Sequence, residues 1–147
     1  MEWSDEYSLG IQEIDDQHKH LLVIFSQIER AIRLQRGWME IFYEVVDLKS
    51  FAKMHFEIEE ALMRLYAYGE SAAHAEEHRY FFIKLAEIEG RSLDGSVGSE
   101  LLTFLCDWLK DHIQGSDKGY AEHILSGAPL VRSSVARPMA NSFKLAS

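Results

Sequence analysis

The stretch that decides the fold is residues 41–66, IFYEVVDLKSFAKMHFEIEEALMRLY. Its core positions recur at alternating spacings of four and three residues, the repeat with which helices pack in bundles. These positions are Ile41, Val45, Leu48, Ala52, His55, Glu59, Leu62 and Tyr66. The stretch therefore predicts one long helix, from about Trp38 to Tyr68, between breaks at Gly37 and Gly69.

The same pattern predicts three further helices. The first is capped by Asp15 or Asp16 and ends near Leu34. The third covers about 71–89, with Ser71 as its cap, and a loop over residues 90–98 separates it from the fourth, which ends near residue 115. Their inner stripes are His18, Leu21, Phe25, Ile28 and Ile32 in the first, His74, His78, Phe81, Leu85 and Ile88 in the third, and Leu102, Leu105, Leu109 and His112 in the fourth.

Short breaks between four helices predict an all-α fold, an antiparallel up-down-up-down four-helix bundle. We expect an irregular N-terminal arm over residues 1–13, anchored by Trp3 and Tyr7, and a short last helix over 120–125. The bundle domain would then comprise residues 1–125. Residues 126–147 would form a tail or linker.

Charge and hydropathy exclude several classes of function. The chain has 15 basic and 24 acidic residues, a formal net charge of -9, and all the acids lie before residue 126. Because nucleic acids and anionic membranes are bound by clustered Lys and Arg, we expect neither as a partner. No uncharged stretch approaches the roughly 18 residues of a membrane span, and the acidic N-terminus lacks the apolar region of a secretory signal. We therefore expect a cytoplasmic protein, with the lone Cys106 as a core or interface residue.

Seven polar residues occupy core positions or follow them directly: His18, His55, Glu59, His74, His78, His112 and Asp117. In an antiparallel bundle the start of one helix lies beside the end of the next, so all seven are expected inside one end of the bundle. Burying so many polar groups is costly unless something pairs them. Imidazoles and carboxylates suit transition-metal ions. The sequence therefore predicts a two-metal site.

Taken alone, each of these residues has a simpler interpretation. A lone core histidine is more often hydrogen-bonded than metal-bound, and paired motifs such as HxxxE are frequent by chance. Convergence of the whole set favours metal. His20 is turned about 200° from His18 around the helix, so it is expected at the surface, as is His123. Asp117 follows His112 by five residues, which predicts either a π-type bulge or a loop that folds back; a cap of the last turn is the alternative role.

The chain resembles the hemerythrin family, specifically its bacterial members. The matching motifs are Asp16-Gln17-His18, His55-Phe56-Glu57-Ile58-Glu59, His74-Ala75-Glu76-Glu77-His78 and Trp108-Leu109-Lys110-Asp111-His112-Ile113-Gln114-Gly115-Ser116-Asp117. The resemblance covers about residues 1–125. It implies a non-haem di-iron centre with an oxo or hydroxo bridge. One iron would be bound by His74, His78 and His112 and the other by His18 and His55, with Glu59 and Asp117 bridging the two.

This implied ligand set leaves one coordination position open, on the iron with two histidines, and a metal needs an open position to bind a small ligand. Apolar neighbours would line that position and keep it dry. The candidates are Leu21, Phe56, Trp108, Leu109 and Ile113.

The resemblance favours reversible O2 binding, by a carrier or store that is not a catalyst. Many di-iron oxygenases use four carboxylates, whereas five imidazoles and two carboxylates should make high-valent iron harder to reach. The alternative is an O2- or redox-sensing domain of a larger signalling protein, with the tail as linker. A di-iron enzyme acting on NO or peroxide ranks third, because no obvious general acid lies outside the ligand set. Sequence by itself leaves Zn, Mn and Cu open as metals.

Overall fold

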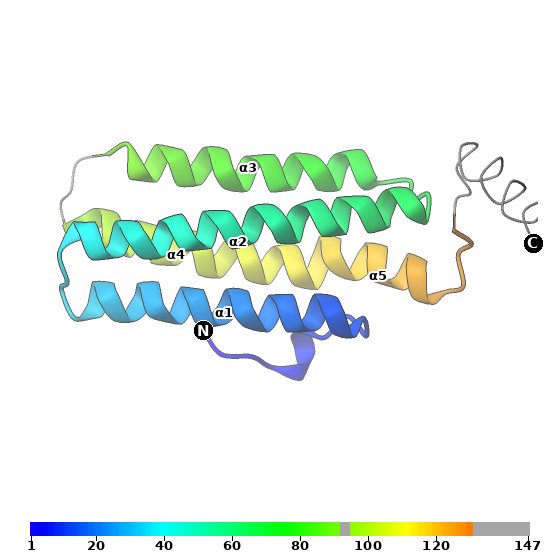
Figure 1. Ribbon diagram of the computed structural model, residues 1–147, viewed down its shortest axis with the longest axis horizontal. Helices are drawn as coiled ribbons and strands as arrows, with labels where there is room; N and C mark the ends of the chain where they lie inside the picture. Colours follow the sequence, from blue (N-terminus) through cyan, green and yellow to red (C-terminus); the bar gives the residue numbers. More distant parts are fainter. Residues whose placement is uncertain (92–94, 131–147) are drawn as a thin grey trace, which may run out of the picture.

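The computed structural model describes residues 1–91 and 95–130, and within them the secondary structure is entirely helical. In chain order the elements are η1 (Asp5–Tyr7), α1 (Gln12–Arg33), α2 (Trp38–Leu65), α3 (Ser71–Glu89), α4 (Gly95–His112), η2 (Ile113–Asp117) and α5 (Lys118–Leu125). The four long helices lie side by side and alternate in direction, with α4 in contact with α1 (Figure 1). The predicted all-α, up-down-up-down bundle is confirmed.

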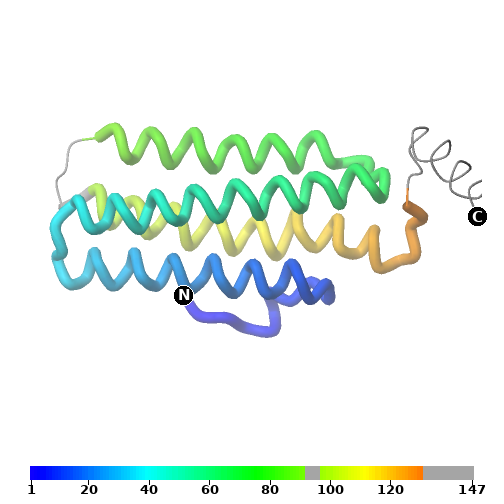
Figure 2. The backbone as a smooth tube through the Cα atoms, in the orientation of Figure 1, coloured from blue at the N-terminus to red at the C-terminus, as the bar shows by residue number. Residues whose placement is uncertain are grey.

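The long helix after α3 runs on through two more elements. Figure 2 shows α4, η2 and α5 as one path along the bundle, so the predicted short last helix is a continuation of the fourth. None of the helices in the described part of the chain is long and apolar enough to cross a membrane. The predicted tail lies mostly outside the described residues, and the domain boundary near residue 125 stays a prediction.

The inner stripes are confirmed over most of their length. All five predicted core residues of α3 are buried: His74, His78, Phe81, Leu85 and Ile88. The stripe drifts at three helix ends. At the end of α1, Ala31 is buried where Ile32 was predicted, and Ile32 is half-buried. Met63 is buried where Leu62 and Tyr66 were expected, and Leu101 is buried in place of Leu102. The reason is that a straight helix has 3.6 residues per turn, so a strict 3.5-residue repeat rotates slowly off the core face.

Helices α1 and α2 end before the glycines that were expected to end them. Gln35 and Ala67 take the left-handed conformation, with φ of 50° and 51°. At the end of α2, the amide of Tyr68 donates to the carbonyl of Met63 at 2.9 Å and that of Ala67 to Arg64 at 3.2 Å. This is the pair of bonds with which helices commonly close on a left-handed residue, usually glycine. Here the chain closes on alanine two residues before Gly69.

The helix starts also differ from the predicted caps. Asp15 lies inside the first turns of α1, and its carboxylate accepts hydrogen bonds from the Leu9 amide and the Ser8 hydroxyl, both at 2.7 Å. It thus fastens the arm that precedes the helix. Ser71 is the first residue of α3 and makes no cap. The predicted loop over 90–98 is shorter, because α4 begins at Gly95.

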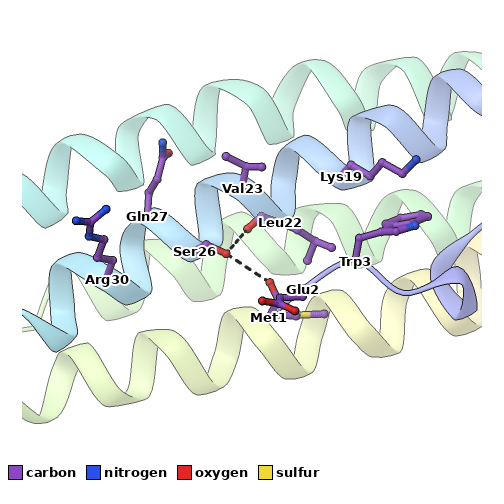
Figure 3. Close-up of a pocket in the computed structure, with 9 residues that line it drawn as sticks. All are labelled: Met1, Glu2, Trp3, Lys19, Leu22, Val23, Ser26, Gln27 and Arg30. Carbon is purple, nitrogen blue, oxygen red and sulfur yellow. Dashed lines mark hydrogen bonds between the residues drawn. The ribbon is translucent and has the colours of Figure 1, made fainter.

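The N-terminal arm folds back along the outside of α1 and is anchored as expected. Trp3 and Tyr7 pack against the core, with ring centroids 6.1 Å apart. The Lys19 ammonium lies 4.9 Å from the centroid of the Trp3 ring, and the Ser26 hydroxyl donates to the Met1 carbonyl at 3.4 Å (Figure 3). The arm and α1 border a groove of about 540 Å³, which none of the seven polar core residues lines.

Candidate metal centre

The seven polar residues that the sequence singles out lie together inside the bundle, toward the end at which α1 and α3 begin. Each is at most 4 % exposed. They come from all four long helices and from η2: His18, His55, Glu59, His74, His78, His112 and Asp117. Their donor atoms form two groups of a size that can hold a metal ion, and Glu59 and Asp117 belong to both groups. The expected convergence is therefore present, while the role of each residue as a ligand stays a prediction.

Glu59 lies between two sets of imidazoles. Its Oε1 is 3.5 Å from Nε2 of His18 and 3.2 Å from Nε2 of His55. Its other oxygen, Oε2, is 3.6 Å from Nε2 of His74 and 3.1 Å from Nε2 of His78. One carboxylate thus turns an oxygen to each set.

Asp117 repeats this arrangement from the other side. Its Oδ2 is 3.1 Å from Nε2 of His18, and its Oδ1 is 3.1 Å from Nε2 of His74 and 3.0 Å from Nε2 of His112. The contacts of both carboxylates divide the imidazoles in the same way. We call His18 and His55 the two-histidine group, and His74, His78 and His112 the three-histidine group.

The polar atoms of the cluster fit metal ions better than they fit one another. Both ring nitrogens of His18 and His74, Oε2 of Glu59 and both oxygens of Asp117 are buried without a hydrogen-bond partner. Such orphaned atoms are expensive in a protein interior. Donor atoms at right angles around an ion, with bonds of about 2.1 Å, would lie about 3 Å apart. The nitrogen–oxygen distances in the cluster run from 3.0 to 3.6 Å, so the residues fit a pair of metal ions.

The electrostatics of the cluster favour added positive charge. Burial alone would raise the pKa of Glu59, but nearby imidazoles, His55 first, hold the pKa well below its ordinary value. Burial and the repulsion from Glu59 act to raise the pKa of Asp117, but the contacts with His112 and His18 together hold it below its ordinary value. Both carboxylates are therefore ionised at neutral pH. Buried anions need a cationic partner.

Three of the imidazoles respond by holding a proton more tightly. Burial acts to lower the pKa of His18, but its contacts with Asp117 and Glu59 raise the pKa to about 9. The same balance raises the pKa of His74 to about 9. For His112 burial is outweighed chiefly by the charge of Asp117, and the pKa rises to about 10. Protons on these rings provide the positive charge that metal ions would otherwise bring.

Asp117 reaches the cluster through a local change of helix type. Residues Ile113–Asp117 form a π-helix between α4 and α5. The wider turn brings Asp117, five residues after His112, onto the inward face that a regular helix would offer to the fourth residue. The π-type bulge is thus confirmed over the loop alternative. A capping role is wrong, because the Asp117 side chain makes no cap hydrogen bond to α5.

Three imidazoles are held at their outward nitrogen by side chains that sequence reasoning missed. Nδ1 of His55 lies 2.7 Å from Oε1 of Gln17, Nδ1 of His78 lies 3.2 Å from Oε2 of Glu60, and Nδ1 of His112 lies 2.7 Å from Oε2 of Glu77. An N–H donated from Nδ1 fixes the tautomer that leaves Nε2 free to bind metal. The sequence did offer one indication of these residues, because each of them is the chain neighbour of a predicted ligand.

Tyr120 is a further residue that sequence reasoning did not place in the site. Its hydroxyl donates to Oε1 of Glu59 at 2.8 Å, and its ring lies edge-on to His74 with centroids 5.4 Å apart. Burial and the charges of Glu59 and Asp117 raise the pKa of Tyr120 well above its ordinary value. The phenol therefore stays protonated and donates.

Aromatic rings cover two members of the three-histidine group. Phe56 stacks on His78 with centroids 3.9 Å apart and planes 5° apart, and Trp108 stacks on His112 at 4.4 Å and 14°. The other predicted lining residues, Leu21, Leu109 and Ile113, are buried in the core. Their role beside a bound ligand stays a prediction.

The two histidines that were expected to lie outside the site do so. His20 is exposed and lies against the ring of Phe51, with centroids 4.4 Å apart. His123 is half-buried, more than predicted, because its Nε2 lies 2.6 Å from the carbonyl oxygen of Tyr66. Neither belongs to the groups that could hold a metal in the described residues.

The fold and the site define a class of helical bundles with an imidazole–carboxylate cluster in the core. The family model "Hemerythrin HHE cation binding domain" matches residues 9–124. Bacteriohemerythrin of Stenotrophomonas maltophilia is 35% identical over 125 residues, which cover 83% of this chain and 80% of that protein. Bacteriohemerythrin of Clostridium acetobutylicum is 29% identical over 82% of this chain and 98% of its own length. A hemerythrin-like protein of Naegleria gruberi is 29% identical over 80% and 88%. The chain belongs to the hemerythrin family, and its buried cluster fits the metal site of such a domain.

Proposed function

We propose that this chain holds two iron ions in the cluster and binds O2 reversibly, as a carrier or store. The observation that carries the proposal is the placement of Glu59 and Asp117, each of which turns one oxygen to each histidine group. Carboxylates so placed suit bridging of two ions, and imidazoles suit iron as neutral donors. An iron pair supplies the redox chemistry by which O2 is taken up and given back.

The unequal groups support a binding position on one side of the centre. Glu59 and Asp117 serve both groups alike, but His18 and His55 offer one imidazole fewer than the other group does. An ion held by His18 and His55 would therefore keep one coordination position for a small ligand, as open metal sites do. Burial of these rings excludes water and protons from that position. This favours binding and release over net oxidation.

The remaining residues keep the donors in place. Gln17, Glu60 and Glu77 hold three imidazoles with Nε2 directed inward. Tyr120 stays protonated and donates a hydrogen bond to Glu59, which fixes the plane of that carboxylate. We take residues 1–125 as the binding unit, since the family match ends at residue 124 and α5 ends at Leu125.

The proposal is tested by loading the metal-free protein with Fe²⁺ under nitrogen and counting bound iron. Two irons per chain are expected. Admitting O2 should produce visible charge-transfer absorption, and removing the gas should abolish it over repeated cycles. Irreversible oxidation within one cycle contradicts a carrier, and fewer than two irons contradicts the centre. Sustained turnover of NO or peroxide with an electron donor would instead make the protein an enzyme.

A further inference from the structure

The side chains that hold the imidazoles follow a pattern around the bundle. Gln17 on α1 holds His55 on α2, Glu60 on α2 holds His78 on α3, and Glu77 on α3 holds His112 on α4. Each holding residue stands next in the chain to a predicted ligand of its own helix. Consecutive helical residues are turned by about 100°. A neighbour of an inward-facing ligand therefore reaches toward the next helix.

The holding residues differ in charge, and the difference follows the division of the histidines. In the three-histidine group, His78 and His112 are each held by a carboxylate. In the two-histidine group, His55 is held by the neutral amide of Gln17. The remaining imidazole of each group, His18 or His74, has a buried Nδ1 with no partner. The three-histidine group thus carries both charged hydrogen bonds.

The charge of the acceptor matters for metal binding. A carboxylate that accepts a hydrogen bond from Nδ1–H gives the ring more negative character than a neutral amide does, and this makes Nε2 a stronger donor to a metal. Glu77 is itself held in place, because the Ser116 hydroxyl lies 2.7 Å from both of its oxygens. Its contact with His112 is therefore oriented from two sides.

We propose that Glu60 and Glu77 are positioning residues that make the three-histidine group the tighter and more electron-rich of the two metal positions. The ion beside His18 and His55 then binds last and leaves first. It is also the ion for which we propose an open coordination position. This inference rests on the proposed two-metal centre. It adds a cause for unequal affinity beyond the number of imidazoles.

The test uses Zn²⁺, which binds the same donors without redox chemistry. The full-length metal-free protein is titrated in competition with a chromophoric chelator to obtain two stepwise dissociation constants. Glu60→Gln and Glu77→Gln keep the size and an acceptor oxygen but remove the charge. Each should weaken the tighter step by about 10- to 100-fold and leave the weaker step nearly unchanged. Gln17→Glu should strengthen the weaker step instead.

The matched control is Glu76→Gln, the same change at the preceding position, where the side chain is exposed and pairs with Arg79. It should alter neither step. Ser116→Ala keeps the charge of Glu77 but removes the hydroxyl that orients its carboxylate. It should therefore weaken the tighter binding step too, but by less than Glu77→Gln does. In spectra of ¹⁵N-histidine-labelled protein, the first equivalent of Zn²⁺ should move the Nε2 signals of the three-histidine group.

The outcomes separate this inference from the centre on which it rests. If the wild type binds fewer than two Zn²⁺ ions, both fail. If it binds two, but the two glutamate variants leave the tighter step unchanged, the centre stands and the role of Glu60 and Glu77 is wrong. A first equivalent that moves the signals of His18 and His55 overturns the inference as well. Circular dichroism at 222 nm confirms that each variant is folded before titration.

Discussion

The hydroxyl of Tyr120 donates a hydrogen bond to Oε1 of Glu59 at 2.8 Å, although the two residues lie 61 positions apart in the chain. Both are fully buried. The contact joins the first turn of α5 to the last third of α2. It also fixes one oxygen of a carboxylate that serves both histidine groups. Tyr120 is therefore part of the site as well as of the core.

Replacing Tyr120 with phenylalanine should destabilise the protein by about 1.5–3 kcal/mol, because a hydrogen bond to a buried charged group is lost and Oε1 keeps no equivalent donor. Urea unfolding of the metal-free protein measures this. The affinity for metal should fall as well, since Glu59 loses its fixed plane. Tyr43→Phe is the matched control, because Tyr43 is 62% exposed and its change should stay within about 0.5 kcal/mol. Equal effects of the two variants would contradict a role for the hydrogen bond.

The metal-free protein should lose stability as the pH rises from neutral to alkaline. His18 and His74 have pKa values near 9 and His112 near 10, against an ordinary value of 6.5. A group whose pKa is raised by folding stabilises the fold while it is protonated. Its contribution is complete below pH 6.5 and is lost as the pH rises through 9 to 10. Urea unfolding at pH 6.5, 8 and 10 should give a decreasing free energy.

Metal should reverse this dependence, because Nε2 must lose its proton before it can bind an ion. The stabilisation given by a fixed excess of Zn²⁺, measured as a shift in Tm, should therefore grow from pH 6.5 to pH 8. Uptake of metal at pH 7 should release protons into a weakly buffered solution. A metal-induced shift in Tm that shrinks over this range would mean that the raised imidazoles are not the metal donors.

The core and the cluster could be predicted because both depend on repeats along the chain. An alternation of three and four residues places Phe81 and Leu85 on the same face as His78, and antiparallel topology then brings the polar ends of the four helices together. Neither step needs the details of side-chain packing. The same reasoning could not find Glu77, because it stands off the stripe and its partner His112 is 35 residues away on another helix.

Local features that depend on tertiary contacts were only partly predictable. The five-residue spacing to Asp117 allowed a bulge or a loop, and the sequence offered no way to decide between them. The bulge fits a helix that must continue into α5, where Tyr120 is held by Glu59. Gly98 was expected in a loop, but it lies within α4, where a Cβ would come within 3.1 Å of Ile32. Gly98 therefore marks a close approach of α1 and α4. The sequence shows the glycine but not the helix that packs against it.

The end of α2 offers a test of backbone strain. Ala67 is exposed and has a φ of 51°, a conformation that costs an L-residue about 1–2 kcal/mol. Ala67→Gly removes that cost but adds about 0.5–1 kcal/mol of unfolded-state entropy. A net gain of about 0.5–1 kcal/mol is expected, which raises Tm by about 2 °C. Gly69→Ala is the opposite change two residues later, where a Cβ would meet nothing within 4 Å; it should not lower Tm. A lower Tm for Ala67→Gly would show that the left-handed turn is absent in solution.

The two-histidine group can be separated from the rest by a pair of variants on one helix. His18 is fully buried and contacts both Glu59 and Asp117, so His18→Ala should release one of the two metal ions and abolish O2 binding. His20→Ala, two residues later on the exposed side of α1, should keep both ions and the O2-dependent absorption. Metal counting after gel filtration, followed by anaerobic O2 titration, gives both readouts. If His20→Ala loses metal as His18→Ala does, the orientation of α1 in the bundle is wrong. If His18→Ala keeps both ions and still binds O2, the open position lies on the three-histidine side.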